Sequence, residues 1–119
     1  MATIQTVSGA IDPAALGVTL IHEHLVTDLR PEWARTPPTP PLERALADIA
    51  AHLRDLRALG LDALVECTPS IMGRDLAAYR ALSAASGLTV VAATGSYRDA
   101  WLPDWLRAAD VAAIAAWYL

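Results

Sequence analysis

The sequence predicts an α/β fold in which parallel strands alternate with helices. Three runs of strand length, residues 18–22, 62–67 and 88–93, are each followed by a segment with helical periodicity. The runs are largely apolar instead of alternating in polarity, which is typical of strands whose two faces are both covered. Repeated strand–helix–strand units of this kind form a parallel sheet.

Two short elements precede the first of these strands. Residues 3–8 alternate in polarity and end at Gly9, which predicts a short antiparallel strand. Residues 12–17 predict one helical turn, because an aspartate N-cap is followed by a proline and a glycine ends the segment. After the first strand, residues 28–40 are predicted to form a loop, since prolines recur along it. A loop of this length within a compact domain is typically functional.

Three helices follow the three strands. The first is predicted over residues 41–59, before Gly60, and the second over residues 74–86, before Gly87. The third begins near Pro103 and continues to the end of the sequence without a capping glycine or a terminal basic residue. This uncapped apolar end indicates part of a larger fold. The first helix carries an apolar stripe at three- and four-residue steps, formed by Leu42, Leu46, Ile49, Leu53 and Leu56.

The motif His22-Glu23-His24 closes the first strand. Side chains two apart in a strand share a face, so His22 and His24 can direct two imidazoles at one point. Imidazole nitrogens suit Zn²⁺ and similar divalent ions, and α/β folds carry their chemistry at the carboxyl ends of their strands. Two ligands alone do not complete a metal site, and the pair could equally hydrogen-bond to neighbouring carboxylates.

Composition excludes several classes of protein. The chain has 119 residues, a net charge of −4 and no basic patch, so we expect no nucleic-acid partner. Cys67 is the single cysteine, which excludes an internal disulfide framework. No leader-like segment or membrane-spanning run is present, so we expect a cytoplasmic protein that does not enter membranes. All nine basic residues are arginines, so chemistry that requires a lysine amine cannot be completed within these residues.

Longer motifs resemble a known family. They lie before and along the first predicted strand, at the start of the second predicted helix, and at and after the end of the third strand: Thr6-Val7-Ser8-Gly9, Ile11-Asp12-Pro13, Leu16 to Leu25, Gly73-Arg74-Asp75, Ala92 to Tyr97, Asp99-Ala100-Trp101 and Pro103. In order and spacing they resemble the N-terminal part of phosphotriesterase-like proteins in the amidohydrolase superfamily. The resemblance implies a partial (β/α)₈ TIM barrel, with the first three βα units preceded by a short N-terminal strand. Residues 1–119 would be the N-terminal part of a single, incomplete domain, since whole barrels have about 250 residues.

The same resemblance implies a metal-dependent hydrolase with Zn²⁺ or another divalent transition metal, two ions per complete site. His22 and His24 would bind the more buried ion, and Tyr97 and Trp101 would contact the substrate. A metal-activated hydroxide would attack a small-molecule ester, whether a phosphoester, a lactone or a carboxylic ester. The resemblance also implies a homodimer. The remaining ligands of the family lie beyond this chain, so the 119 residues alone are expected to be inactive and prone to aggregate.

Two questions remain open at this stage. Glu66 ends the second strand, where it would either orient a metal-bound histidine by accepting its hydrogen bond or serve structurally, by capping a loop or pairing with Arg74. The function also has alternatives: a non-catalytic binding module built on the same barrel segment, or a mononuclear metal-binding protein completed by self-association.

Overall fold

The computed structural model describes residues 2–30 and 42–118. The molecule is flat, with extents of 46 × 42 × 19 Å. Most of the loop predicted over residues 28–40, and the last residue of the helix predicted at the end of the chain, lie outside the described residues. Within the described part of the chain, no helix is both long and apolar enough to span a membrane.

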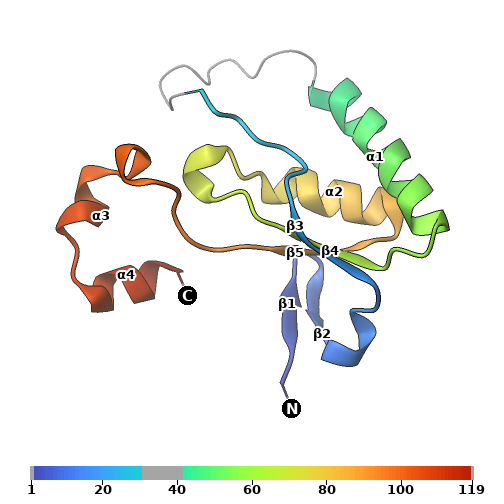
Figure 1. Ribbon diagram of the computed structural model, residues 1–119, viewed down its shortest axis with the longest axis horizontal. Helices are drawn as coiled ribbons and strands as arrows, with labels where there is room; N and C mark the ends of the chain where they lie inside the picture. The colour runs from blue at the N-terminus through green and yellow to red at the C-terminus, as the bar shows by residue number, and fades with distance from the viewer. Residues whose placement is uncertain (1, 31–41, 119) are drawn as a thin grey trace.

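A three-stranded parallel sheet forms the centre of the molecule, as the sequence predicts (Figure 1). Its strands are β3 (Thr19–Glu23), β4 (Ala63–Glu66) and β5 (Thr89–Ala92), in that spatial order. Each pair is parallel, so the carboxyl ends of all three strands lie at one edge of the sheet. Side chains that follow these ends are therefore brought together although they are far apart in the sequence.

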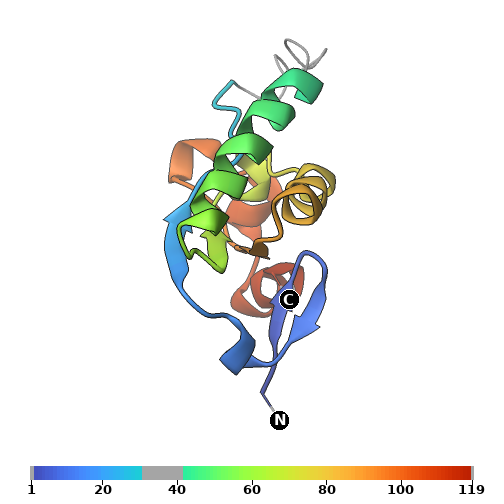
Figure 2. The same cartoon turned by 90° about the vertical axis from the view of Figure 1, so that its right-hand side faces the viewer.

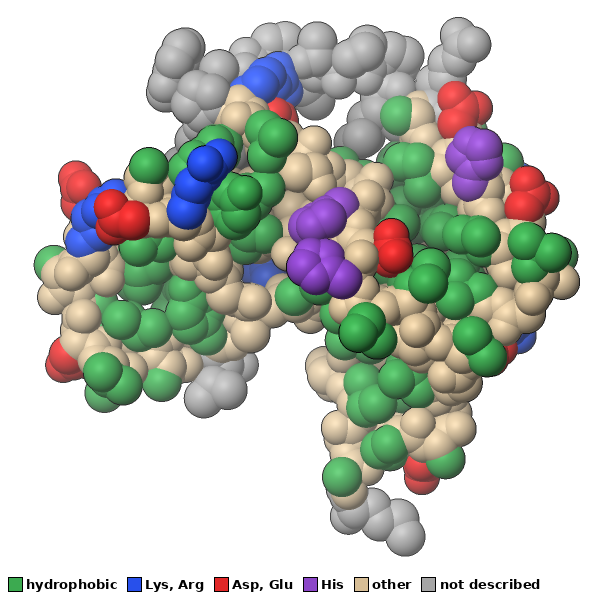
Figure 3. Space-filling model, viewed as in Figure 1, with side chains coloured by type: hydrophobic (Ala, Val, Ile, Leu, Met, Phe, Trp, Pro, Cys, Tyr) green, Lys and Arg blue, Asp and Glu red, His purple; other side chains and the backbone are tan. Residues whose placement is uncertain are grey.

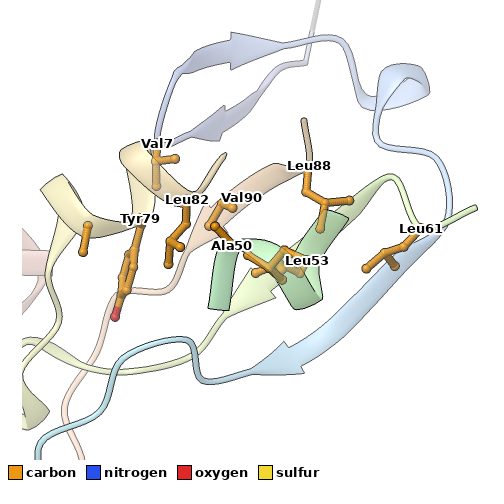
Figure 4. Packing of buried hydrophobic residues seen from close by; sticks show 10 residues of the cluster. Val7, Ala50, Leu53, Leu61, Tyr79, Leu82, Leu88 and Val90 are labelled. Carbon is orange, nitrogen blue, oxygen red and sulfur yellow. The ribbon is translucent and has the colours of Figure 1, made fainter. Parts of the chain in front are cut away.

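Two helices cover one face of the sheet and pack against each other (Figures 1 and 2). They are α1 (Leu42–Ala58), between β3 and β4, and α2 (Leu76–Ser86), between β4 and β5. Figure 4 shows the buried core between these helices and the sheet. The core consists of apolar side chains from both helices, from β4 and β5 with the residues before them, and from the N-terminal hairpin: Val7, Ala50, Leu53, Leu61, Leu64, Ala78, Tyr79, Leu82, Leu88 and Val90.

The second helix begins and ends where local sequence signals place it. The carboxylate of Asp75 accepts hydrogen bonds from the backbone N–H groups of Ala77 and Ala78, both at 3.0 Å. Gly87 follows the helix with φ of +75°, and its N–H donates to the carbonyl of Ser83. The predicted helix over 74–86 is thus confirmed, with its start two residues later.

The short antiparallel strand predicted over residues 3–8 is confirmed as β1 (Ile4–Thr6), and a second strand that the sequence analysis did not predict pairs with it to form a β-hairpin. Strand β1 turns at residues 7–8 and pairs antiparallel with β2 (Gly9–Ile11). The Thr6 hydroxyl donates to the carbonyl of Gly9 at 2.6 Å, which closes the turn. The N–H of Val7 donates to the carbonyl of Val90 at 2.9 Å and so attaches the hairpin to the edge of β5.

The single helix predicted from about residue 103 to the end is wrong. The structure has two helices, α3 (Asp104–Ala108) and α4 (Val111–Tyr118), with an extended residue, Ala109, between them. Asp110 supplies the start of α4, because its carboxylate accepts from the N–H of Ala113 at 2.8 Å. Trp105 of α3 packs edge-on against Trp117 of α4, with ring centroids 5.1 Å apart.

Strands β3 and β4 pair with one extra residue in β3. Leu20 lies beside Leu64, and Glu23 lies beside Glu66, so three steps along β3 span two steps along β4. This irregularity is a β-bulge, which re-aims the side chains beyond it. Because side chains alternate between faces, Glu23 shares the face of Leu64 and Glu66, and the residues on either side of Glu23 lie on the opposite face.

The start of β3 is attached to the start of β4 by Asp62. Its carboxylate accepts from the backbone N–H of Val18 at 2.9 Å and from the guanidinium of Arg57. These contacts, the Val18 hydrogen bond first, hold the pKa of Asp62 below its ordinary value. The ionised carboxylate therefore stabilises the folded state, and protonation in acid removes that contribution.

This linkage predicts a pH dependence of stability. The contribution of Asp62 is fully present above the unfolded pKa of an aspartate, about 3.9, and is lost as the pH falls through the lower folded pKa. Urea unfolding of the wild type and of Asp62→Asn at a series of pH values checks this. We expect the wild type to be the more stable near neutral pH and the difference to shrink in acid. Two parallel stability curves would contradict the prediction.

Candidate metal site

The site lies at the edge of the sheet where β3, β4 and β5 end. His22 and His24 are at the end of β3, Glu66 ends β4, and Tyr97 and Trp101 follow β5. Neighbouring strands are about 4.8 Å apart, so the ends of β3 and β5 are separated by about 10 Å. The site residues predicted from the sequence thus follow three adjacent strand ends.

The structure brings the two predicted imidazoles together. The rings of His22 and His24 have centroids 5.4 Å apart and meet edge to face at 64°. Both side chains are exposed, and Figure 3 shows two of the three histidines side by side on one face. The third histidine, His52, is exposed on α1. The His-x-His pair is therefore open to solvent, from which an ion could approach it.

The carboxylate of Glu66 is fully buried and accepts three hydrogen bonds. The N–H of Leu25 donates to Oε1 at 3.1 Å, and Thr68 donates its N–H to Oε2 at 3.0 Å and its hydroxyl to Oε1 at 2.6 Å. Glu66 thus caps the loops that follow β3 and β4, one of the structural alternatives left open by the sequence. The alternative pairing of Glu66 with Arg74 is not formed, and Arg74 donates instead to the carbonyl of Ala93 at 2.6 Å.

Thr68 connects the buried carboxylate to the histidine pair. Its Oγ1 lies 2.9 Å from Nδ1 of His24 and 3.1 Å from the hydroxyl oxygen of Thr27. Glu66 therefore reaches His24 through Thr68 and not by direct contact. Sequence reasoning missed Thr68 and Thr27. The spacing of Glu66 and Thr68, two apart at a strand end, is the signal that points to Thr68.

Tyr79 of α2 closes this end of the core. The side chain is fully buried, and its hydroxyl donates to the carbonyl of Val26 at 3.3 Å. Burial, and next the nearby carboxylate of Glu66, raise the pKa of Tyr79 above its ordinary value. The phenol therefore stays protonated and fastens the loop after β3 to α2.

The two aromatic residues predicted to contact substrate also lie together. Tyr97 and Trp101 meet edge to face, with ring centroids 6.2 Å apart, and the guanidinium carbon of Arg98 lies 5.1 Å from the centroid of the Tyr97 ring. Tyr97 is 47% exposed, so part of its ring is open to a ligand. Trp101 ends a 3₁₀ turn, Asp99–Trp101, that directs the chain into α3.

Residues 2–30 and 42–118 contain no group of three or more histidine, cysteine, aspartate or glutamate side chains placed to hold a metal ion. Among these residues the predicted site comprises two imidazoles with a buried hydrogen-bonded support and, after β5, an aromatic pair. Any further ligands would have to come from outside these residues.

The chain is similar to known proteins in sequence and in fold. The chain is 36% identical over 99 residues to a phosphotriesterase homology protein of Mycobacterium tuberculosis, and 29% identical over 138 residues to an N-acetyltaurine hydrolase of Bos taurus. These matches cover 82% and 91% of this chain, but 30% and 39% of the relatives. The solved structure of an organophosphorus hydrolase from Deinococcus radiodurans superposes with a TM-score of 0.74 at 39% identity, over 82% of this chain and 30% of that one.

The chain thus spans about a third of the length of the proteins it matches, and its three βα units form part of a (β/α)₈ barrel, as the sequence predicts. The family model described as the phosphotriesterase family matches residues 2–116. The chain therefore belongs to the phosphotriesterase family.

Proposed function

We propose that this chain supplies part of the active site of a metal-dependent hydrolase that cleaves ester bonds in phosphoesters, lactones or carboxylic esters. The observation that carries the proposal is the pair of exposed imidazoles, with centroids 5.4 Å apart, at the carboxyl end of β3. Two of the similar proteins, an organophosphorus hydrolase and an N-acetyltaurine hydrolase, support hydrolysis as the reaction class.

The donor set fits a divalent transition metal. His22 and His24 provide two nitrogen ligands whose rings are close together and open to solvent. They would hold one ion jointly with ligands from outside the described residues, where the ligands of a second ion would also lie. A bound divalent cation would acidify a water molecule and polarise the ester.

The chain's own residues would bind and orient the reactants. His22 and His24 would fix the position of the ion, and the buried support beneath His24 would hold its ring in place. Tyr97 and Trp101 would contact the apolar part of the ester and exclude water from one side of it. Arg98, beside the Tyr97 ring, adds a positive charge to that side.

Metal titration and hydrolysis by the full-length protein, as its gene encodes it, test the proposal. Zn²⁺ affinity is measured by competition with a chelator, and turnover with an aryl phosphotriester, a γ-lactone and an aryl carboxylic ester. We expect His22→Ala and His24→Ala each to lower Zn²⁺ affinity by about 100-fold or more and to abolish turnover. The loss of affinity should exceed that caused by removing a hydrogen-bond partner of a ligating histidine, which is about 10–100-fold. His52→Ala is the matched control, because that side chain is exposed on α1.

The outcomes separate the candidate functions. Unchanged metal affinity and turnover in both site variants would contradict the proposal. Tight Zn²⁺ binding by the wild type, without turnover of any of the three esters, would favour a metal-binding module over an enzyme.

A further inference from the structure

A buried hydrogen-bonded chain runs from β4 to one of the two imidazoles. It starts at Glu66 Oε1, passes through the hydroxyl of Thr68 at 2.6 Å and reaches Nδ1 of His24 at 2.9 Å. Glu66 and Thr68 are both fully buried, whereas the ring of His24 is exposed. Two buried polar side chains thus support one exposed histidine.

The direction of each hydrogen bond follows from counting hydrogens. A threonine hydroxyl has one hydrogen to donate and two lone pairs that accept. The Glu66 carboxylate acts as an acceptor, because Oε1 and Oε2 also accept from the N–H groups of Leu25 and Thr68. The Thr68 hydroxyl therefore donates its one hydrogen to Oε1 of Glu66. Thr68 Oγ1 can then only accept from its other neighbours. One lone pair takes a hydrogen from Nδ1 of His24, and the second takes the hydroxyl hydrogen of Thr27.

We propose that Glu66 and Thr68 fix His24 in the tautomer that carries its proton on Nδ1, which leaves Nε2 as the lone-pair nitrogen. Thr68 is thus a positioning residue that acts through His24. The inference rests on the proposed function in one respect only, namely that the ligand of Nε2 would be a divalent cation. Free imidazole in water populates both tautomers, so the chain selects the form that is ready to bind a cation through Nε2.

Nitrogen-15 NMR of the full-length protein tests this directly. The metal-free protein is labelled at histidine, and spectra are recorded at about pH 8.5, which is well above the ordinary pKa of a free histidine side chain, about 6.5. We expect His24 to show one protonated nitrogen, Nδ1. In Thr68→Val, which keeps the shape of the side chain and removes the acceptor, we expect the Nε2-protonated form to appear. Thr68→Ser restores the hydroxyl and should restore the wild-type spectrum.

Two further readouts sharpen the test. His52, exposed on α1, is the internal control whose tautomer mixture should not change in any variant. Zn²⁺ affinity should fall about 10–100-fold in Thr68→Val, the cost typical of losing a partner that orients a ligating histidine, and recover in Thr68→Ser.

A wild-type spectrum with the His24 proton on Nε2, or a Thr68→Val variant that keeps it on Nδ1, would overturn the inference. The wild-type spectrum decides the tautomer without any variant having to fold, and it is recorded without metal. A protein that binds no cation would therefore contradict the proposed function and still report whether Thr68 sets the tautomer.

Discussion

Replacing Glu66 with leucine is expected to lower the free energy of unfolding by about 3–5 kcal/mol, because three donors around this buried carboxylate lose their acceptor together. Leucine has a similar size, so the main change is chemical and not steric. The N–H groups of Leu25 and Thr68 are held by the backbone and cannot turn to new partners, and each unsatisfied group costs about 1–3 kcal/mol. Urea unfolding of the full-length protein measures the loss.

The conservative variant Glu66→Gln separates hydrogen bonding from packing. Glutamine keeps one oxygen acceptor at this position and replaces the other with a donor, so part of the network survives. We expect a loss of about 1–2 kcal/mol. If Glu66→Leu changed stability by less than about 0.5 kcal/mol, the range of an ordinary surface substitution, the carboxylate would not be the support that the geometry indicates.

Local signals explain why the sheet and its helices could be predicted from the sequence. Asp75 and Gly87 begin and end α2 through hydrogen bonds to residues within four positions, so their effect does not depend on the rest of the fold. The apolar strands carry equally local information, because their composition alone indicates coverage on both faces. The strand order and parallel pairing then follow from the alternation of strands with helices.

The break between α3 and α4 could not be placed by the same reasoning. Alanine favours helix throughout residues 108–116, and this propensity hid the N-cap signal of Asp110. In the structure, a tertiary contact between Trp105 and Trp117 accompanies the break in the helix. In one straight helix, Trp105 and Trp117 would be about 18 Å apart along the axis. Their rings are 5.1 Å apart, so the chain turns at Ala109 to bring α4 back against α3.

The candidate site also combines features that local sequence predicts with features that depend on distant parts of the chain. The shared face of His22 and His24 follows from their spacing, and the structure brings the two rings together. The bulge in β3 and the contact from Thr68 to His24 depend on pairing with a strand more than 40 residues away, which no local pattern encodes. Sequence reasoning therefore found His22, His24 and Glu66 and missed Thr68, the buried residue that connects Glu66 to His24.

The start of β3 leads to the second prediction, which concerns Gly17. A Cβ atom at this position would lie 2.3 Å from Oδ2 and 2.7 Å from Cβ of Asp62, and Gly17 has φ of +66°. Rotating the Asp62 side chain away would relieve only the first contact and would break its hydrogen bond to the N–H of Val18. We expect Gly17→Ala to lower the free energy of unfolding by about 3 kcal/mol, from backbone strain, the lost hydrogen bond and overpacking.

Gly87→Ala is the matched control for this variant. Gly87 has a similar φ of +75°, and nothing lies within 4 Å of a Cβ placed there, so the substitution measures backbone strain alone. That strain is expected to cost about 1–2 kcal/mol. The excess loss in Gly17→Ala then reports the contact between Gly17 and Asp62, which joins the starts of the two strands that carry His22 and Glu66. Equal losses of stability in the two variants would mean that the backbone at the start of β3 shifts at little cost to make room for the new Cβ. In that case the contact with Asp62 would not set the position of the strand that carries the histidines.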